Sequence, residues 1–262
     1  MIVNVFASGS SGNCLLLSEG DSHLLIDAGI SARRIEQALH TAGLQINDIG
    51  GVLITHEHSD HIMGLKTLLN RYALPLYAPH TVAARLGGMQ PKALESMTII
   101  PVGQDFSVGS LHVRAFHTPH DTDESVGYRV EGQGGTFALA TDMGHVTEEI
   151  LDGLLGADTV LIESNHDPAM LRDGPYPPQL KRRILSDHGH LSNADCALLA
   201  ARLAQAGTGT VILGHLSREN NRPALALEEC EKTLAGSGTR LFCAPVLGSL
   251  RLEVKENVTC SV

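Results

Sequence analysis

A dense run of metal-ligand side chains constrains this sequence more than any other feature. Residues 56–61 read His-Glu-His-Ser-Asp-His, so three histidines and one aspartate fall within six positions. The run follows the apolar segment Gly51–Thr55, which we predict to be a buried strand. It leads into Asp60–Arg71, whose apolar residues have helical spacing. A loop between a strand and a helix allows alternate side chains to converge on one point.

Imidazole and carboxylate groups are common protein ligands of zinc, manganese and iron. Four such side chains at this spacing fit two adjacent metal ions. His56 and His58 would bind one ion. Asp60 and His61 would bind the other. A polar loop with incidental histidines is the alternative, but this density of ligand types is hard to reach by chance.

One loop cannot complete two coordination shells, so we expect further ligands at the ends of later strands. Histidine or aspartate follows three apolar runs that we predict to be strands. The candidates are His117 or His120, Asp142, and His215. Any one of them alone would more often be a surface or turn residue. Together they indicate a metal site, in which Asp142 could bridge both ions.

Apolar runs bounded by glycine alternate along the chain with segments of helical spacing. The predicted strands are Ile2–Ala7, Cys14–Ser18, Leu24–Asp27, Gly51–Thr55, Leu74–Ala78, Thr98–Val102, Leu111–Phe116, Val126–Val130, Thr136–Ala140, Thr159–Glu163, Val211–Gly214, Leu241–Ala244 and Ser249–Val254. The predicted helices are Ser31–Ala42, Asp60–Arg71, Glu148–Leu155, Asn193–Gln205 and one near Ala224–Leu234. This order is satisfied by an α/β fold of four αββα layers, with two mixed sheets face to face and helices outside. We expect a single domain over residues 1–262.

Composition excludes several classes of protein. The net charge of −10 has the wrong sign for a protein that coats nucleic acid, although bound metals supply local positive charge. The five cysteines are scattered and never spaced as Cys-x-x-Cys, so we expect neither a disulfide framework nor a structural cysteine-zinc site. We also expect a cytoplasmic protein without membrane contact, because no signal-peptide pattern or membrane-spanning apolar stretch is present.

The histidine run and the later His, Asp and His resemble the signature of the metallo-β-lactamase superfamily, over essentially the whole chain. Four strings further resemble the YycJ-like (WalJ-like) subgroup, which is regarded as containing 5′-to-3′ DNA exonucleases. These strings are SGSSGNC at residues 8–14, ESNHD at 163–167, GHLSN at 189–193 and GHLSRENN at 214–221. The resemblance implies the αββα fold and a hydrolase. The short segment between Asp142 and His215 leaves no room for the large cap of RNA-processing members.

Residue by residue, the resemblance implies seven ligands for two divalent metal ions, with zinc or manganese expected and iron also compatible. The implied ligands are His56, His58 and His120 on one ion, Asp60, His61 and His215 on the other, and Asp142 between them. It thus selects His120 over His117, and it makes Asp27 a residue that orients ligands. An Asx-type turn before Gly29 is the alternative for Asp27.

Two metals held about 3.5–4 Å apart can share a bridging water and lower its pKa toward neutrality. We expect the resulting hydroxide to attack phosphorus, with Asp60 and Asp142 as the catalytic carboxylates. Neutral imidazole is the ligand form, so activity should fall in acid.

Polar residues outside the ligand set are candidates for substrate or phosphate binding. They are Ser8, Ser10, Ser11, Asn13, His166, His190, Ser192 and Asn220. For the glycine-rich loop at residues 8–13, a tight turn is the alternative, and for Ser192 the alternative is a helix N-cap. A basic cluster at Lys181–Arg183 could guide a nucleic-acid strand, although such clusters usually form a solvated face.

The leading functional hypothesis is a phosphodiesterase that removes nucleotides from a nucleic acid 5′ end, with DNA as the expected partner. A thioester or lactone hydrolase of the same fold is the second hypothesis, and it would require a more apolar pocket. A non-catalytic scaffold on this fold is the third. It is disfavoured because every expected ligand is present.

Overall fold

Two mixed sheets form the centre of the molecule, as predicted, and each has seven strands. The computed structural model describes residues 1–246 and 248–255. The first sheet has the order β14 (Leu250–Glu253), β1 (Ile2–Ala7), β2 (Cys14–Glu19), β3 (Ser22–Ile26), β4 (Gly51–Leu53), β5 (Leu76–Ala78) and β6 (Met97–Ile99). The second has the order β13 (Arg240–Cys243), β12 (Thr210–Gly214), β11 (Thr159–Glu163), β10 (Gly135–Ala140), β9 (Val126–Gly132), β8 (Leu111–His117) and β7 (Asp105–Val108).

Each sheet contains a parallel and an antiparallel part. Strands β3 to β6 are parallel neighbours in the first sheet, and β10 to β13 are parallel in the second. The remaining named pairs are antiparallel. Parallel strands end at one edge of a sheet, and in such folds the loops at that edge commonly carry the functional residues.

An aliphatic core joins the inner faces of the two sheets. Val5 and Leu17 from the first sheet share a buried cluster with Leu161 and Ile212 from the second. Tyr128 lies in the same layer, and its hydroxyl donates to the carbonyl of Ile54 at 2.6 Å. The hydrogen bond satisfies a polar group that would otherwise be costly to bury.

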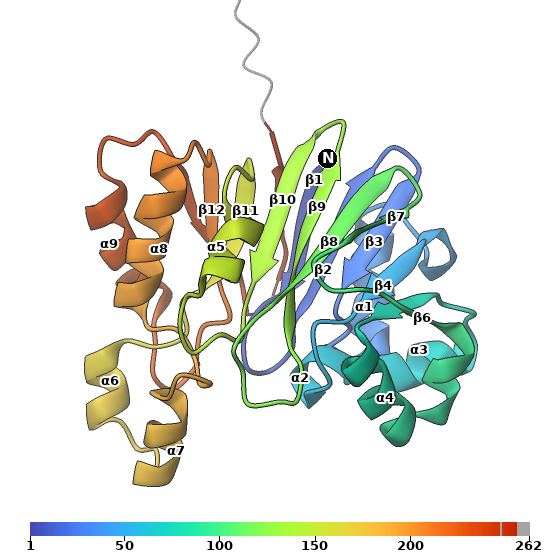
Figure 1. Cartoon of the computed structure of the whole chain (residues 1–262), viewed down its shortest axis with the longest axis horizontal. Helices are drawn as coiled ribbons and strands as arrows, with labels where there is room; N and C mark the ends of the chain where they lie inside the picture. The colour runs from blue at the N-terminus through green and yellow to red at the C-terminus, as the bar shows by residue number, and fades with distance from the viewer. Residues whose placement is uncertain (247, 256–262) are drawn as a thin grey trace, which may run out of the picture.

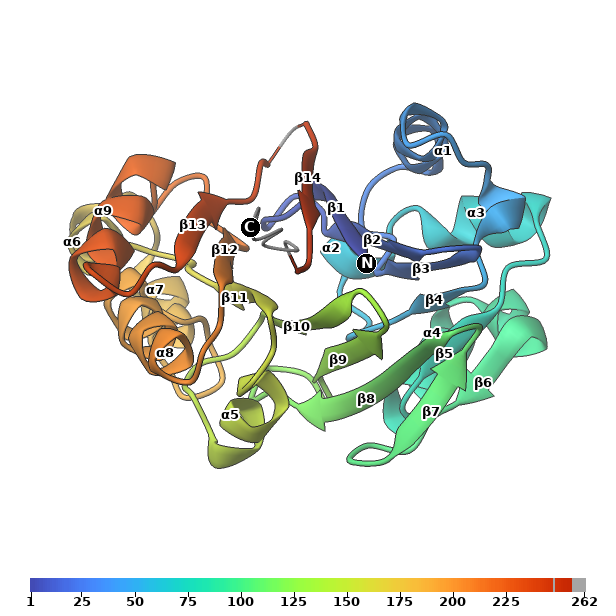
Figure 2. The ribbon, with the colours of Figure 1, turned by 90° about the horizontal axis from the view of Figure 1, so that it is seen from above.

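Helices cover the outer faces (Figures 1 and 2). The helices that pack on the first sheet are α1 (Ala32–Thr41), α2 (Ser59–Ile62), α3 (Leu65–Arg71) and α4 (His80–Met89). Those on the second are α5 (Glu148–Leu154), α8 (Asn193–Gln205) and α9 (Pro223–Leu234). Two short helices, α6 (Pro168–Asp173) and α7 (Pro178–Ile184), project beyond the edge of the second sheet, at the lower left of Figure 1. The 3-10 turns are η1 (Ile46–Asp48) and η2 (Pro91–Ser96).

The predicted helix over Asp60–Arg71 is wrong in one respect, because it is broken into α2 and α3 at Gly64. The amide of Gly64 donates to the carbonyl of Ala28 at 2.8 Å, and a Cβ added there would lie 2.2 Å from the carbonyl oxygen of Ile30. The chain therefore needs glycine at this close backbone approach.

Several elements were not predicted from the sequence. Helix α4 and strand β7 lie in weakly patterned segments, and β7 is a short edge strand paired with β8. Helix α6 begins with a readable signal, since Asp167 accepts from the amide of Met170 at 2.8 Å and proline follows it.

Four of the five cysteines are free thiols in the described residues, and Cys260 lies outside them. Within residues 1–246 and 248–255, each helix is too short or too polar to cross a bilayer.

Candidate metal centre

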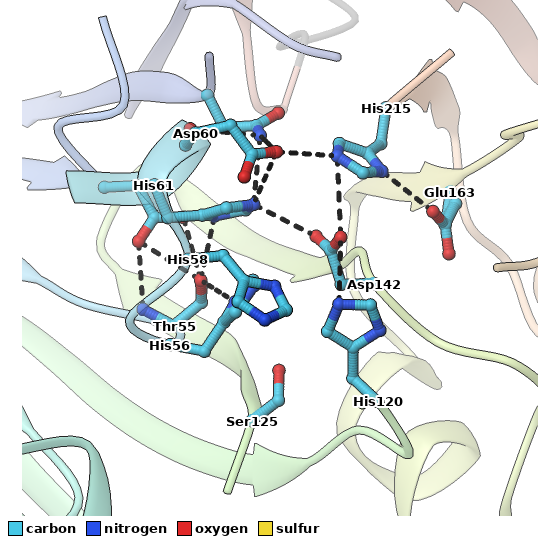
Figure 3. A network of polar contacts seen from close by, with 12 residues as sticks. Thr55, His56, His58, Asp60, His61, His120, Ser125, Asp142, Glu163 and His215 are labelled. Carbon is cyan, nitrogen blue, oxygen red and sulfur yellow. Dashed lines mark hydrogen bonds and ion pairs between the residues drawn. The ribbon is translucent and has the colours of Figure 1, made fainter. Parts of the chain in front are cut away.

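Buried ligand-type side chains meet where several strands end (Figure 3). His56 follows β4, His120 follows β8, Asp142 follows β10, and His215 follows β12 directly. All four are buried. His117, the alternative to His120, is half exposed and lies 3.0 Å from Glu149 on the surface. The structure therefore brings His120, and not His117, to the centre.

The first group of side chains, here called the three-histidine cluster, contains His56, His58 and His120. One ring nitrogen from each lies within 4.8 Å of the other two. His56 Nε2 is 3.0 Å from His58 Nδ1. Burial lowers the pKa of His56 well below its usual value and also lowers that of His120. Neutral imidazole is the form that binds a metal ion.

The second group, here called the carboxylate-backed cluster, contains Asp60, His61 and His215. Asp60 Oδ2 lies 3.6 Å from His61 Nε2 and 3.5 Å from His215 Nε2. On the far side of each ring, His61 Nδ1 is 2.7 Å from Asp27 Oδ2, and His215 Nδ1 is 2.8 Å from Glu163 Oε1. A carboxylate behind a histidine fixes the ring and raises its basicity.

Neighbouring carboxylates decide the pKa values of the two histidines in this second cluster. Burial opposes a charged ring, but the carboxylates of Asp27 and Asp142 raise the pKa of His61 to about 10. Burial also opposes charge on His215, but Asp142, Asp60 and Glu163 raise its pKa well above the usual range. The site therefore binds positive charge, which a divalent cation supplies when it displaces these protons.

Asp142 lies between the two clusters. Its Oδ1 is 3.7 Å from His120 Nε2 and 3.5 Å from His215 Nε2. Its Oδ2 is 3.3 Å from His61 Nε2 but makes no well-aligned hydrogen bond, although it is buried. Burial disfavours its ionisation, yet the charges of His215 and His61 lower the pKa of Asp142 well below its usual value. An ionised carboxylate with free lone pairs at this position suits a ligand shared by two cations.

Three non-glycine residues among those described have left-handed backbone conformations, and all three are at this centre. The φ angles are 59° at Asp27, 57° at Asp142 and 54° at His215. Such conformations cost roughly 1–3 kcal/mol each and persist where the surroundings enforce them. At Asp27 the enforcing contacts include the amide of Thr55, which donates to Oδ1 at 2.9 Å, and the Thr55 hydroxyl, which donates to Oδ2 at 2.9 Å.

Glu163 was not among our predicted site residues, yet its carboxylate contacts two histidines and two backbone amides at the centre. Its Oε1 is 2.8 Å from the Nδ1 atoms of both His190 and His215, and its Oε2 accepts from the amides of Met143 and Leu191. Burial disfavours its charge, but His190 and His215 lower the pKa of Glu163 to about 2. The available signal was a carboxylate at the last position of the buried strand β11.

The glycine-rich loop after β1 divides into supporting and exposed residues. Ser8 Oγ accepts from the amide of His215 at 2.8 Å, and Asn13 Nδ2 lies 3.0 Å from His61 Nε2. Both are buried against the ligands. Ser10 and Ser11 are exposed and remain open to a substrate.

Three other residues expected at the substrate are buried in the structure. His166 and Asn220 are almost completely buried, at 1% and 0% exposure. Ser192 is the N-cap of α8, where its hydroxyl accepts from the amide of Asp195 at 3.1 Å. Both ring nitrogens of His166 and the amide oxygen of Asn220 are buried without a hydrogen-bond partner. The role of these three residues in substrate binding stays a prediction.

Asp121 is a second acidic side chain that we had not predicted at the site. Its Oδ1 lies 3.3 Å from His120 Nε2 and 3.7 Å from His58 Nε2, and is buried without a hydrogen bond. Its Oδ2 pairs with Arg183 on α7. One member of the predicted basic cluster thus contacts the metal centre through Asp121. Lys181 instead donates to the carbonyls of Arg172 and Gly174 at 2.6 and 2.8 Å.

Comparison with known proteins gives a consistent result. The Beta-lactamase superfamily domain model matches residues 22–216. Exodeoxyribonuclease YycJ of Bacillus anthracis is 40% identical over 238 residues, covering 90% of this chain and 89% of that protein. Exodeoxyribonuclease WalJ of Streptococcus pneumoniae serotype 2 is 39% identical over 226 residues, covering 85% and 84%.

A solved structure shows the same fold. The metallo-β-lactamase fold protein YhfI from Bacillus subtilis matches with a TM-score of 0.72 and 17% identity, covering 96% of this chain and 99% of that one. Three observations identify the family: the domain match, the near full-length relatives and the His/Asp clusters at the strand ends. The chain belongs to the metallo-β-lactamase superfamily of hydrolases, in its YycJ-like (WalJ-like) group.

Proposed function

We propose that this chain is a two-metal phosphodiesterase that removes nucleotides from the 5′ end of DNA. The observation that carries the proposal is the position of Asp142, an ionised carboxylate within 3.3–3.7 Å of ring nitrogens from both clusters. Relatives that cover most of the chain are named exodeoxyribonucleases, which supports DNA as the substrate.

Two cations would be held by the residues already described. The three-histidine cluster would hold one, the carboxylate-backed cluster the other, and Asp142 would contact both. Zinc and manganese suit this set of imidazole and carboxylate donors, and iron is also compatible. When bound, two such ions lower the pKa of a coordinated water and offset charge that develops on phosphate oxygens.

The chain's own groups would position the ions and move protons. Asp27 and Glu163 fix the rings of His61 and His215, which leaves their Nε2 atoms available to hold the cations. Asp60, whose side chain is 22% exposed, is the more accessible of the two carboxylates proposed as catalytic. Asp142 is nearly inaccessible and would serve as the shared ligand.

His190 is placed to donate a proton to the leaving oxygen. Its Nδ1 binds Glu163 at 2.8 Å and lies 3.8 Å from Asp142 Oδ1, while its side chain stays 23% exposed. Burial opposes its charge, but Glu163 raises the pKa of His190. A protonated imidazole near a reacting phosphate is a suitable general acid.

The test is digestion of DNA labelled at either the 5′ or the 3′ end, with manganese or zinc, beside an Asp142→Ala control of measured metal content. Stepwise release of label from the 5′ end by the unmodified protein alone supports the proposal. Release from the 3′ end would refute the polarity, and faster digestion of matched RNA would refute the substrate. Turnover of a thioester or lactone without DNA cleavage would leave only the fold and the metal centre.

A further inference from the structure

A small pocket, here called the side pocket, opens beside the metal centre and has a volume of about 170 Å³. Three of its wall residues touch the ligands. Asp121 lies 3.3 Å from His120 Nε2, the carbonyl of Gly189 is 3.2 Å from His120 Nδ1, and His190 is 3.8 Å from Asp142. A group in the side pocket would therefore be a direct neighbour of a phosphate on the metals.

The side pocket is lined by both polar and apolar residues. Ser10 and Ser217 supply hydroxyl groups. Ser217 Oγ accepts from the amide of Asn220 at 3.2 Å, which leaves its hydrogen free to donate. Tyr176 and Leu180, from the segment that holds α7, supply an aromatic and an aliphatic surface. A nucleotide likewise combines an apolar part, its flat base, with a polar part, its sugar phosphate.

Tyr176 differs from the other three tyrosines. The hydroxyl of Tyr72 donates to Glu36 at 3.0 Å, that of Tyr128 donates to a carbonyl, and Tyr77 stacks on Phe106 with centroids 5.8 Å apart. Within residues 1–246 and 248–255, Tyr176 makes no hydrogen bond and no ring contact. In a chain with 3% aromatic residues, this half-buried ring has a free face at the side pocket.

The segment that presents Tyr176 is held in place before any ligand arrives. Its sequence, Gly-Pro-Tyr-Pro-Pro at residues 174–178, has prolines on both sides of the ring, and proline restricts the backbone. Lys181 Nζ donates to the carbonyls of Arg172 and Gly174, and Arg183 pairs with Asp121. A fixed aromatic ring binds a ligand with little loss of conformational entropy.

We propose that the side pocket binds the terminal nucleotide of the DNA strand, with its base stacked on Tyr176 and its sugar phosphate facing Ser10 and Ser217. This inference rests on the proposed function and adds the residues that recognise the strand end. A cavity of about 170 Å³ holds a single base but not a whole nucleotide, so the sugar phosphate would lie at its mouth, beside the metals.

The experiment measures equilibrium binding of deoxyadenosine 5′-monophosphate and of inorganic phosphate to the metal-loaded protein by calorimetry. The variants are Tyr176→Ala, Tyr176→Phe and, as a control at the opposite end of α7, Leu185→Ala, whose side chain is 61% exposed. We expect Tyr176→Ala to weaken nucleotide binding about ten- to a hundredfold, the range given by aromatic stacking, and to leave phosphate binding unchanged. Tyr176→Phe and Leu185→Ala should stay within about threefold of the unmodified protein, since neither removes the stacking face.

Equal nucleotide affinity for the unmodified protein and Tyr176→Ala would overturn the inference. So would an equal loss of nucleotide and phosphate affinity, which would mean that the ring only supports the loop. If Tyr176→Ala does not fold, Tyr176→Leu replaces it, because leucine keeps bulk without an aromatic face. If the unmodified protein binds the nucleotide through Tyr176 but digests no DNA, the inference stands and the proposed function fails.

Discussion

The two ligand clusters both contain histidine, but the pKa shifts of His56 and His120 are opposite in direction to those of His61 and His215. In the three-histidine cluster, the far ring nitrogens of His56 and His120 meet only neutral groups, the Thr55 hydroxyl and the Gly189 carbonyl. In the carboxylate-backed cluster, His61 and His215 meet buried carboxylates. Burial therefore lowers the pKa of the first pair, whereas charge raises that of the second. The group that contacts the far ring nitrogen therefore decides the direction of the pKa shift. A neutral group there favours the neutral imidazole, and a carboxylate favours the protonated one.

The largest expected effect comes from removing the side chain common to both clusters. Asp142→Asn should reduce nuclease activity to background and lower metal content at both clusters, because the neutral amide no longer offsets two cations. Metal analysis after gel filtration, beside an activity assay, measures this. Loss of metal from only one cluster would show that Asp142 belongs to that cluster alone.

Glu163→Gln separates the clusters, because His215 is the one proposed metal ligand that has this carboxylate behind its ring. The change also removes the charge behind His190, so metal affinity is the decisive measurement. We expect a roughly 10–100-fold loss of metal affinity or activity, the usual effect of losing an outer carboxylate. The effect should be confined to the carboxylate-backed cluster. Titration with cobalt, followed by its visible spectrum, distinguishes the two sites. An equal loss of metal affinity at both clusters would show that Glu163 does not act on the carboxylate-backed cluster alone.

Metal binding to the carboxylate-backed cluster should depend strongly on pH. His61 must lose a proton, and its pKa is about 10, so the apparent affinity should rise roughly tenfold per pH unit for each proton displaced. Isothermal calorimetry in buffers of different ionisation enthalpy counts the protons released. Release of no proton at pH 7 would show that these rings are already neutral.

The stability of the metal-free protein should show the opposite trend. The pKa of His61 is raised from 6.5 to about 10, so its contribution is complete below about pH 6.5 and is lost as pH rises through 10. The pKa of Glu163 is lowered from 4.5 to about 2, so its contribution is present above about pH 4.5 and is lost as pH falls through 2. The lowered pKa values of His56 and His120 remove stability as pH falls below 6.5, so the melting temperature with chelator should be highest near pH 6.5. A maximum in alkali would contradict these assignments.

The smallest effect is expected at the hydroxyl that links the clusters. Thr55 Oγ1 lies 2.9 Å from Asp27 Oδ2 and 3.1 Å from the Nδ1 atoms of both His56 and His61. Thr55→Val keeps the shape and removes this donor, which should lower the free energy of unfolding by about 1–3 kcal/mol. Urea denaturation measures the change. An unchanged value would mean that the Thr55 amide alone satisfies Asp27.

The sequence was most informative where polar residues interrupt apolar strands. Hydrophobic runs that end in His or Asp predicted both the sheets and the convergence of residues such as His56 and His215, because strand ends share an edge. Periodicity did not show the break at Gly64, which depends on backbone atoms of Ala28 and Ile30 distant in sequence.

Substrate residues were harder to predict, because hydroxyl, amide and imidazole groups serve structure and binding equally well. Ser8 and Ser10 stand two positions apart in one loop, yet one is buried against His215 and the other is exposed. Tyr176 carries no motif, and only the fold brings it to the metal centre.

The left-handed backbones of Asp27, Asp142 and His215 have an evolutionary consequence. Glycine would relieve the strain at each position but would remove a carboxylate or an imidazole from the centre. Selection for catalysis and selection for a durable fold thus oppose each other at these three strand ends. A lineage released from catalysis could gain stability by substitution at these same positions. In such a descendant, these three positions of the metal centre would be the first to accept substitutions.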